Sequence, residues 1–303
     1  MTAAEAGDKP RMVVLAGPNG SGKSMVTDGL KNSPDFPKLY INADDIARGE
    51  LAHMEDRTAR ELLAAQLADQ RRQDAVQAGR SFAFETVMST PAKLALFDEA
   101  RAKGFIVDLI FVTTDDADVN LVRVENRVKK GGHPVAPQKI KERYERAMDL
   151  LPVAMLKADA CSVFDNSVDN RPPNLVASKR DGTIELEPGA PQWVAERVAL
   201  PLQQREASRA SCLAKATENA PGASLEDADV SRGSNYSGLV AALTDVHVLQ
   251  RKAGAVGRFT LHDRALCPPQ TYQVGKASAI LYTYGSDGKH QGPKPRYSNG
   301  RSR

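Results

Sequence analysis

The sequence predicts an α/β fold with a doubly wound, mostly parallel sheet. Short apolar runs with strand character alternate with longer segments whose apolar residues recur at helical spacing. One run, residues 105–112, is almost continuously apolar and rich in β-branched residues, as in a parallel strand that is covered on both faces. Strands and helices that alternate in this way build a sheet with helices on its faces.

The expected elements follow one another over the first two thirds of the chain. Pro34 marks the end of the first helix, and Pro91 opens a later one at its first turn. A hairpin is expected around Asp181-Gly182, a pair that favours a two-residue turn, and a helix at about 192–206 closes the domain. We expect strands at residues 12–16, 39–42, 81–86, 105–112 and 160–167, and helices at about 22–30, 54–79, 91–104, 118–130 and 138–157.

Composition predicts four parts along the chain. Residues 1–206 form the α/β domain, and residues 207–237 form a linker, because small and polar residues dominate there. In residues 238–287 apolar character returns in short pieces separated by glycine and proline, which predicts a small β-barrel or β-roll domain. Residues 288–303 carry basic side chains and no acid, and we expect a disordered tail.

The bulk composition predicts a globular protein of the cytoplasm. Hydrophobic residues make up 41% and charged residues 26% of the chain, and a net charge of +3 is too small to indicate nucleic acid by itself. The three cysteines lie far apart, which suits a reducing compartment and gives no metal site. Residues 1–10 lack the apolar stretch of a signal peptide, and no apolar run reaches the length that spans a bilayer.

A phosphate-binding motif lies between the first expected strand and the first expected helix. Its residues are Gly17-Pro18-Asn19-Gly20-Ser21-Gly22-Lys23-Ser24, which match the pattern G-x-x-x-x-G-K-[ST]. The glycines let successive N–H groups point into one concavity that holds phosphate oxygens. Lys23 then reaches the β- and γ-phosphates, and the Ser24 hydroxyl binds the Mg²⁺ that bridges them. The motif predicts a P-loop protein that binds a nucleoside triphosphate.

A carboxylate pair follows the strand expected at residues 39–42. The carboxyl ends of parallel strands line the ligand crevice of an open α/β sheet, so this pair lies near the P-loop. Asp44 could hold an acceptor hydroxyl and take its proton during phosphoryl transfer. Asp44 could instead cap the following helix, in which case Asp45 would be the working acid.

Two further sets of polar residues follow the next strands. Glu85 ends an apolar strand, where a carboxylate without a partner would be costly, so we expect Glu85 and the adjacent Thr86 to contact the substrate or a metal-bound water. Asp115 and Asp116 come several residues after the apolar core of the strand at 105–112. We expect them to cap the next helix rather than to hold a metal.

Basic residues on the helix at 118–130 could form a lid. Arg123 and Arg127 are four residues apart and share one helix face, where they could stabilise charge on a transferring phosphoryl group. His133 lies in the Gly-Gly-His break that follows, and could contact substrate or phosphate. The alternatives are a solvated charged face for the arginines and an ordinary turn residue for His133.

Several segments, in their order along the chain, carry a family resemblance. They are the P-loop segment 16–24, Ile41-Asn42-Ala43-Asp44-Asp45-Ile46, Phe82-Ala83-Phe84-Glu85-Thr86, Gly131-Gly132-His133, Arg143-Tyr144-Glu145-Arg146 and Phe164-Asp165-Asn166-Ser167. Together they span about residues 11–170 and resemble the zeta toxin family of kinases, in its shorter Gly-Gly-His branch.

The resemblance implies a P-loop kinase-like fold and an ATP- and Mg²⁺-dependent transfer to a small nucleotide-like acceptor, UDP-N-acetylglucosamine or a relative of it. It assigns the catalytic base to Asp44, substrate contact to Glu85, and the phosphate and Mg²⁺ groups to Lys23 and Ser24. Arg127 is the preferred candidate for the lid arginine, and Arg123 is the alternative candidate. The resemblance also implies a toxin with a separately encoded antitoxin.

The segment 246–282 resembles the KfrB-type domain of plasmid-encoded proteins, which would place the gene on a mobile element. Two other functions stay open. One is a polynucleotide 5′-hydroxyl kinase whose basic tail holds the phosphate backbone. The other is a nucleotide-dependent binding module in which hydrolysis switches partner contacts.

Overall fold

The computed structural model describes residues 9–131 and 135–291. Contacts within the chain divide it into two compact units, Met1–Gln204 and Arg205–Arg303. None of the described helices combines the length and the apolar character that crossing a bilayer demands.

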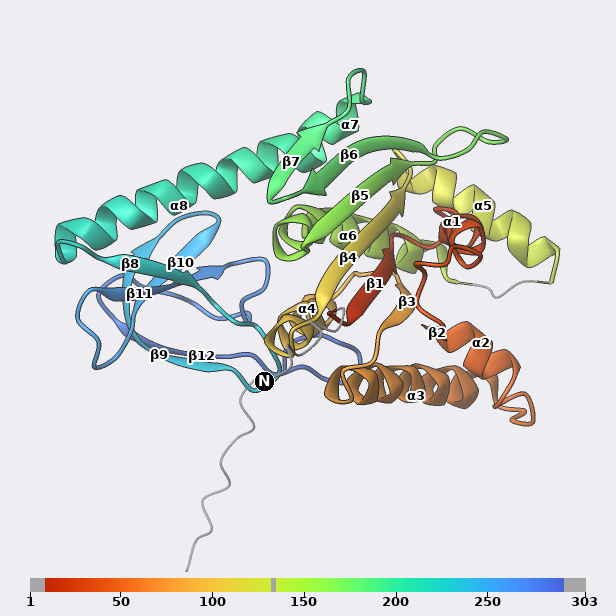
Figure 1. Ribbon diagram of the computed structural model, residues 1–303, viewed down its shortest axis with the longest axis horizontal. Coiled ribbons are helices and arrows are strands. Elements are labelled where there is room, and N and C mark those ends of the chain that lie inside the picture. The colour runs from red at the N-terminus through yellow and green to blue at the C-terminus, as the bar shows by residue number, and fades with distance from the viewer. Residues whose placement is uncertain (1–8, 132–134, 292–303) are drawn as a thin grey trace, which may run out of the picture. The chain divides into compact units, whose positions relative to one another are not determined.

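The first unit is built on a seven-stranded sheet in the order β2-β3-β1-β4-β5-β6-β7 (Figure 1). The strands from β2 to β5 in this order are parallel, and β6 and β7 add an antiparallel hairpin at the β5 edge. The doubly wound, mostly parallel sheet predicted from the sequence is thus confirmed. The strands are β1 (Arg11–Ala16), β2 (Leu39–Ile41), β3 (Phe82–Thr86), β4 (Ile106–Thr113), β5 (Ala160–Asp165), β6 (Asn174–Arg180) and β7 (Thr183–Leu186).

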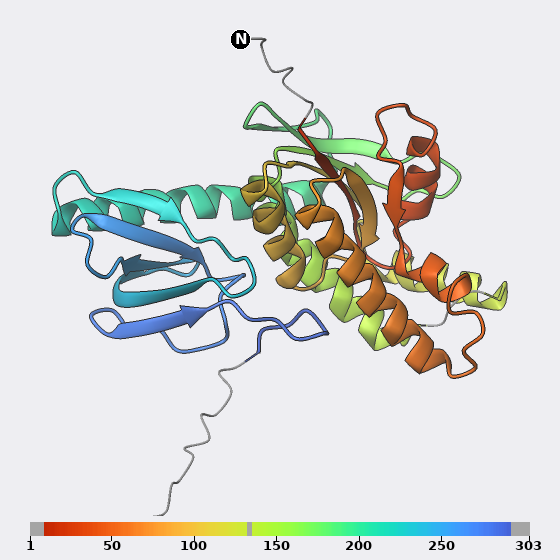
Figure 2. The ribbon, with the colours of Figure 1, turned by 60° about the horizontal axis from the view of Figure 1, so that its bottom comes forward.

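Helices connect the parallel strands. Figure 2 shows α3, α4 and α6 lying side by side on one face of the sheet. Lys93 of α4 pairs with Asp69 of α3 at 2.9 Å, and Lys157 of α6 pairs with Asp98 of α4 at 2.7 Å. The helices are α1 (Lys23–Leu30), α2 (Ala43–Arg48), α3 (Arg57–Gln77), α4 (Ala92–Ala102), α5 (Ala117–Lys129), α6 (Pro137–Lys157) and α7 (Gln192–Val194), followed by the π-helical turn η1 (Ala195–Ala199) and α8 (Leu200–Asn219).

The central strand β1 is buried on both faces. Val13 and Leu15 pack with Ala83 of β3 and with Leu30 of α1 on one face. Met12 and Val14 alternate to the other face and are fully buried as well. Since β1 lies between β3 and β4, the loop that follows it emerges beside the ends of both neighbouring strands.

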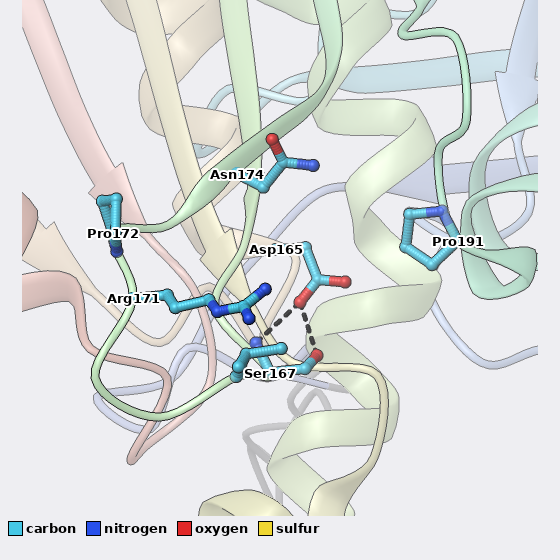
Figure 3. Close-up of a pocket in the computed structure, with 7 residues that line it drawn as sticks. Asp165, Ser167, Arg171, Pro172, Asn174 and Pro191 are labelled. Atoms are coloured by element: carbon cyan, nitrogen blue, oxygen red, sulfur yellow. Dashed lines mark hydrogen bonds between the residues drawn. The ribbon is translucent and has the colours of Figure 1, made fainter.

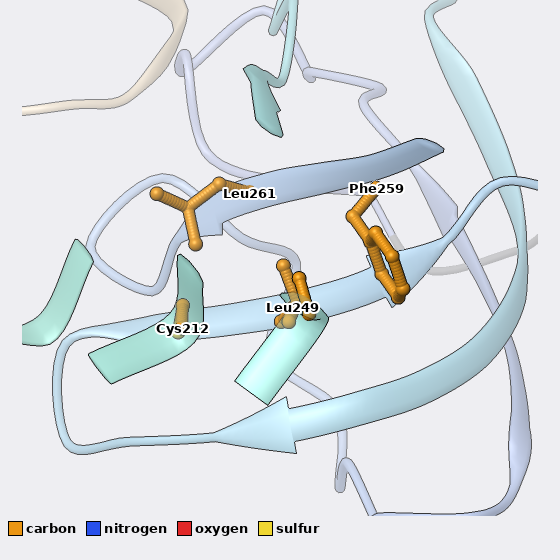
Figure 4. Close-up of a cluster of buried hydrophobic side chains, with 5 residues drawn as sticks. Cys212, Leu249, Phe259 and Leu261 are labelled. Carbon is orange, nitrogen blue, oxygen red and sulfur yellow. The ribbon is translucent and has the colours of Figure 1, made fainter. Parts of the chain in front are cut away.

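The second unit contains a five-stranded sheet in the order β12-β9-β10-β11-β8. Pairing is antiparallel except between β11 and β8. One face carries Leu249, Phe259 and Leu261, which pack against Cys212 and Ala216 of α8 (Figure 4). The strands are β8 (Ser224–Asp227), β9 (Asn235–Leu243), β10 (His247–Arg251), β11 (Arg258–Asp263) and β12 (Ala277–Leu281).

The prediction of a linker at residues 207–237 is wrong as a description of local structure. Helix α8 runs through to Asn219, and β8 and the start of β9 lie in the remainder. Cys212 and Ala216 lie four residues apart on one helix face and are fully buried. Small side chains of this kind give a weak apolar pattern, although they bury well against a sheet.

Part of the expected disordered tail is also paired. The Gln291 N–H donates to the Thr283 carbonyl at 2.9 Å, and the Gly285 N–H donates to the Lys289 carbonyl at 2.9 Å. Residues 288–291 therefore close a turn, while residues 292–303 lie outside the described residues.

Candidate active site

The loop between β1 and α1 has the form of an anion-binding nest. Gly20 and Gly22 have φ angles of +82° and +91°, in the left-handed region that glycine tolerates best. A Cβ atom at Gly20 would lie 2.6 Å from the Asn120 carbonyl oxygen, and one at Gly22 would lie 2.2 Å from Asn166 Nδ2. Glycine is therefore required at both positions by backbone conformation and by close packing.

Lys23 is the first residue of α1. Its ammonium group donates to the carbonyl oxygens of Gly17 and Pro18 at 2.8 Å each. Burial lowers the pKa of Lys23 to about 8; the charge of Glu85 opposes this shift, the charge of Arg127 adds to it, and the charge of Asp44 opposes it. Charged side chains of β3, α5 and α2 thus act on Lys23 at the start of α1, and Lys23 keeps its charge at neutral pH.

Glu85, the last residue but one of β3, lies in a hydrogen-bond network that spans three elements. Its Oε1 atom accepts from the Thr27 hydroxyl of α1 at 2.7 Å and from the Tyr40 hydroxyl of β2 at 2.9 Å. Asn42 Nδ2 donates to the Tyr40 oxygen at 3.1 Å. These contacts fix the carboxylate near Lys23, where a substrate could reach it. Thr86 uses its hydroxyl to accept the Met88 N–H at 3.0 Å, which shapes the turn after β3.

The structure separates Asp44 from the capping role. Asn42 caps α2, because its Oδ1 atom accepts the Asp44 N–H at 2.8 Å. Asp45 pairs with Arg48 at 2.6 Å. The Asp44 side chain is exposed, and its charge acts on the pKa of Lys23. After β4, the predicted cap at Asp116 is confirmed, since its side chain accepts the Asp118 N–H at the start of α5.

The two arginines of α5 differ in their surroundings. Arg123 donates to the Asn166 carbonyl at 2.7 Å and pairs with Asp169 at 2.5 Å, so its guanidinium holds the loop after β5. Arg127 is exposed, and its charge reaches Lys23. Of the two arginines, Arg127 is the one whose charge acts on the P-loop lysine, while Arg123 is engaged by the loop after β5. His133 lies outside the described residues.

A cavity of about 400 Å³ lies at the end of β5. Asp165 is fixed at its wall, because its Oδ1 atom accepts the Ser167 N–H at 2.7 Å and its Oδ2 atom accepts the Trp193 Nε1–H at 2.9 Å. Figure 3 shows Arg171, Pro172 and Asn174 around the same space. Asn166 lies between the lining residues Asp165 and Ser167 and donates to the Ser21 carbonyl at 2.8 Å, so this wall of the cavity adjoins the P-loop in space although the two are far apart in sequence.

Comparison with known families identifies the first unit. The model of the family described as zeta toxin matches residues 2–171, which is more than half of the chain. The chain belongs to the zeta toxin family. With the P-loop and the parallel sheet, this membership makes the zeta toxin unit a P-loop kinase, a nucleotide-binding phosphotransferase.

Individual relatives of this zeta toxin family member are distant. An uncharacterized protein of Haemophilus influenzae is 28% identical over 134 residues, which cover 44% of this chain and 92% of the relative. The crystal structure of AvrRxo1-ORF1:AvrRxo1-ORF2 with sulphate ions contains a chain that is 16% identical, with a TM-score of 0.51, over 63% of this chain and 64% of that one.

This similarity shows a shared fold, and the present chain spans less than two thirds of the matched AvrRxo1 chain. A structure of the PezAT chromosomal toxin-antitoxin system of Streptococcus pneumoniae is 16% identical over 69% of this chain and 90% of that chain, with a TM-score of 0.43.

Sequence reasoning missed the residues that support the zeta toxin P-loop from outside the motif. Asn120 of α5 donates to the Asn19 carbonyl at 2.7 Å, and Asn166 holds the Ser21 carbonyl. Tyr40 and Thr27 orient Glu85. The sequence feature that could have indicated a role for Asn166 was its position directly after a strand, beside Asp165. No sequence feature indicated a role for Asn120, because a single asparagine within a charged helix is typical of an exposed position.

Proposed function

We propose that this protein transfers the γ-phosphate of ATP to a hydroxyl group of a small nucleotide-like acceptor, UDP-N-acetylglucosamine or a related nucleotide. The P-loop between β1 and α1 of a zeta toxin family member carries the proposal, with Lys23 at the start of α1 and with the charges of Glu85, Arg127 and Asp44 acting on Lys23. A cation for the phosphates, a base for the hydroxyl and an arginine for the transferring group are the parts that a small-molecule kinase needs.

The P-loop would hold the triphosphate of ATP through its N–H groups and Lys23. The cavity after β5 would take the nucleoside, with Val168 and Pro172 against the base and with Arg171 and Asn174 as polar contacts. Its volume of about 400 Å³ suits a group of that size.

Magnesium would arrive with the nucleotide. The described residues contain no cluster of three or more His, Cys, Asp or Glu side chains that could hold a metal without it. The exposed hydroxyl of Ser24 fits the single protein ligand that P-loops offer, with phosphate oxygens and waters as the other ligands. The bound ion would neutralise charge on the β- and γ-phosphates.

The γ-phosphoryl group would pass from ATP to the acceptor hydroxyl, with ADP as the leaving group. The acceptor oxygen forms a bond to the γ-phosphorus while the bond between that phosphorus and the bridging β–γ oxygen breaks. Asp44 takes the hydroxyl proton, and Lys23 with Arg127 stabilises the charge on the phosphoryl oxygens. Glu85 and Thr86 would contact the acceptor beside β3. The products are ADP and a phosphorylated acceptor.

We also propose that the protein acts as the toxin of a toxin-antitoxin pair in the cytoplasm, with its antitoxin encoded separately. Membership of the zeta toxin family supports this role. The first unit would be the kinase domain, and the five-stranded sheet of the second unit would be a separate β domain of the KfrB type.

A direct assay tests the activity. Purified protein, Mg²⁺ and γ-labelled ATP are incubated with UDP-N-acetylglucosamine, with a 5′-hydroxyl oligonucleotide, or with a metabolite extract, and the labelled product is identified by mass. The Lys23→Ala variant is the matched control. Label on a small nucleotide-like acceptor, absent with Lys23→Ala, supports the proposal; label only on the oligonucleotide, or ATP hydrolysis alone, contradicts it.

Growth arrest on expression of the wild type but not of Lys23→Ala tests the toxin role.

A further inference from the structure

We propose that Asn120 and Asn166 are positioning residues that set the P-loop in its phosphate-binding form before ATP arrives. Each side chain holds one carbonyl of the loop, and each thereby directs the next N–H toward the phosphate site. The inference rests on the proposed function, because it assigns the loop to the triphosphate of ATP.

Both asparagines reach the loop from buried positions outside it. Asn120, on α5, has 0% exposure and donates from Nδ2 to the Asn19 carbonyl at 2.7 Å. Asn166, after β5, has 7% exposure and donates from Nδ2 to the Ser21 carbonyl at 2.8 Å. Water cannot easily replace donors at such positions, so the loss of either amide leaves a buried carbonyl poorly satisfied.

The planar peptide bond converts these two contacts into the direction of two N–H groups. In a trans peptide, the C=O of one residue and the N–H of the next point in opposite directions. A carbonyl of Asn19 held toward Asn120 therefore turns the Gly20 N–H the other way, and a carbonyl of Ser21 held toward Asn166 does the same for Gly22. Within the described residues, neither of these N–H groups has a hydrogen-bond partner, as expected for donors that await a ligand.

Close packing restricts the loop further. The space that a Cβ atom of Gly20 would need is filled by the Asn120 carbonyl, and the corresponding space at Gly22 is filled by Asn166 Nδ2. Each asparagine therefore touches the glycine whose N–H it directs. The loop has little room to turn its peptides over, so less ordering remains to be done when the phosphates bind.

One helix links the two contacts. Arg123, one turn after Asn120 on α5, donates to the Asn166 carbonyl at 2.7 Å. The Asn166 N–H donates to the Thr113 carbonyl at the end of β4 at 2.8 Å. The same helix carries Arg127, whose charge reaches Lys23. Helix α5 thus fixes the loop that binds the phosphates and presents the arginine that acts on them.

Binding measurements on Asn120→Ala and Asn166→Ala test the proposal. For each variant we expect the Kd for ATP and for inorganic tripolyphosphate to rise roughly tenfold, while the Kd for adenosine stays unchanged. Asp169→Asn is the control, because it removes an exposed ion pair of Arg123 and leaves both amides in place. Variants whose Tm falls but whose Kd values match the wild type would show a purely structural role and overturn the proposal.

Amide NMR signals of the nucleotide-free protein give a second measurement that needs no ATP. Asn120→Ala should shift or broaden the Gly20 signal with little change at Gly22, and Asn166→Ala should do the reverse. If an alanine variant does not fold, the uncharged Asn120→Ser and Asn166→Ser variants serve for the same signals. If the wild type binds no ATP, the proposed function alone is refuted. If the Gly20 and Gly22 amide signals do not change in these variants, the positioning role alone is refuted.

Discussion

Tyr40 donates its hydroxyl to Glu85 Oε1 at 2.9 Å and so ties the end of β2 to the end of β3. Thr27 donates to the same oxygen at 2.7 Å from α1. Both donors use Oε1, and none of the described residues donates to Oε2, which a substrate group could therefore reach. Burial, with the nearby Glu85 charge, raises the pKa of Tyr40 far above neutrality, so the phenol remains a donor across the physiological range.

Replacing Tyr40 by phenylalanine should weaken the use of the acceptor and leave ATP binding intact. The ring stays, but Glu85 loses one of two donors and can rotate, so we expect kcat/KM for the acceptor to fall roughly five- to tenfold. Steady-state kinetics at saturating ATP measure this change. Tyr236→Phe, in the C-terminal unit, is the matched control. Equal kcat/KM values for both variants would mean that Tyr40 does not position Glu85.

The lowered pKa of Lys23 predicts that ATP binds less tightly at alkaline pH. Burial lowers this pKa from 10.5 to about 8 in the free protein, so the ammonium loses its proton as the pH rises through that value. The triphosphate binds the charged form better, and ATP should therefore raise this pKa and cause proton uptake above about pH 8. Calorimetry in buffers of different ionisation enthalpy measures the protons taken up. Lys23→Met should show none, and a wild type without uptake would contradict the prediction.

The fold of the first unit was largely predictable because its central strands, β1 and β4, are mostly apolar. The run from Ile106 to Val112 and the P-loop after Ala16 each specify their local structure without help from the rest of the chain. The region after Leu200 was not predictable in the same way. Its helix buries only small side chains, Cys212 and Ala216, against a sheet that begins later in the sequence.

The active site, too, was predictable from the sequence only in part. Glycines, Lys23 and Ser24 form a contiguous motif, and Glu85 is recognisable as a carboxylate at a strand end. Asn120 acts on Asn19 from 101 positions away, and Asn166 acts on Ser21 from 145 positions away. Contacts between residues so far apart depend on the strand order and leave no periodic pattern in a single sequence.

The two arginines of α5 should separate into a catalytic and a structural role. Arg127→Ala should lower kcat roughly a hundredfold, because a positive charge beside Lys23 is lost from the transition state. Arg123→Ala should instead lower the free energy of unfolding by roughly 1–2 kcal/mol, since it loses the Asn166 carbonyl and Asp169. Measurements of kcat and of the free energy of unfolding in denaturant for both variants test this assignment. A collapse of kcat in Arg123→Ala with normal stability would reverse the assignment.

Asp44 offers the sharpest test of the mechanism. Asn42, not Asp44, caps α2, so Asp44→Asn should leave the helix and the fold unchanged. The amide keeps the size and much of the hydrogen bonding of the carboxylate but cannot take a proton. We expect ATP to bind as before while phosphoryl transfer falls by roughly 10²–10⁴.

Asp45→Asn is the matched control for this substitution. It removes the neighbouring carboxylate of the same helix and breaks only an exposed pair with Arg48, which should cost less than about 1 kcal/mol of stability. Nucleotide affinity and turnover are measured side by side in both variants. If turnover survives in Asp44→Asn and collapses in Asp45→Asn, the base is Asp45. If it survives in both, neither carboxylate takes the proton, and Glu85, the remaining acid whose charge acts on Lys23, becomes the residue to replace next.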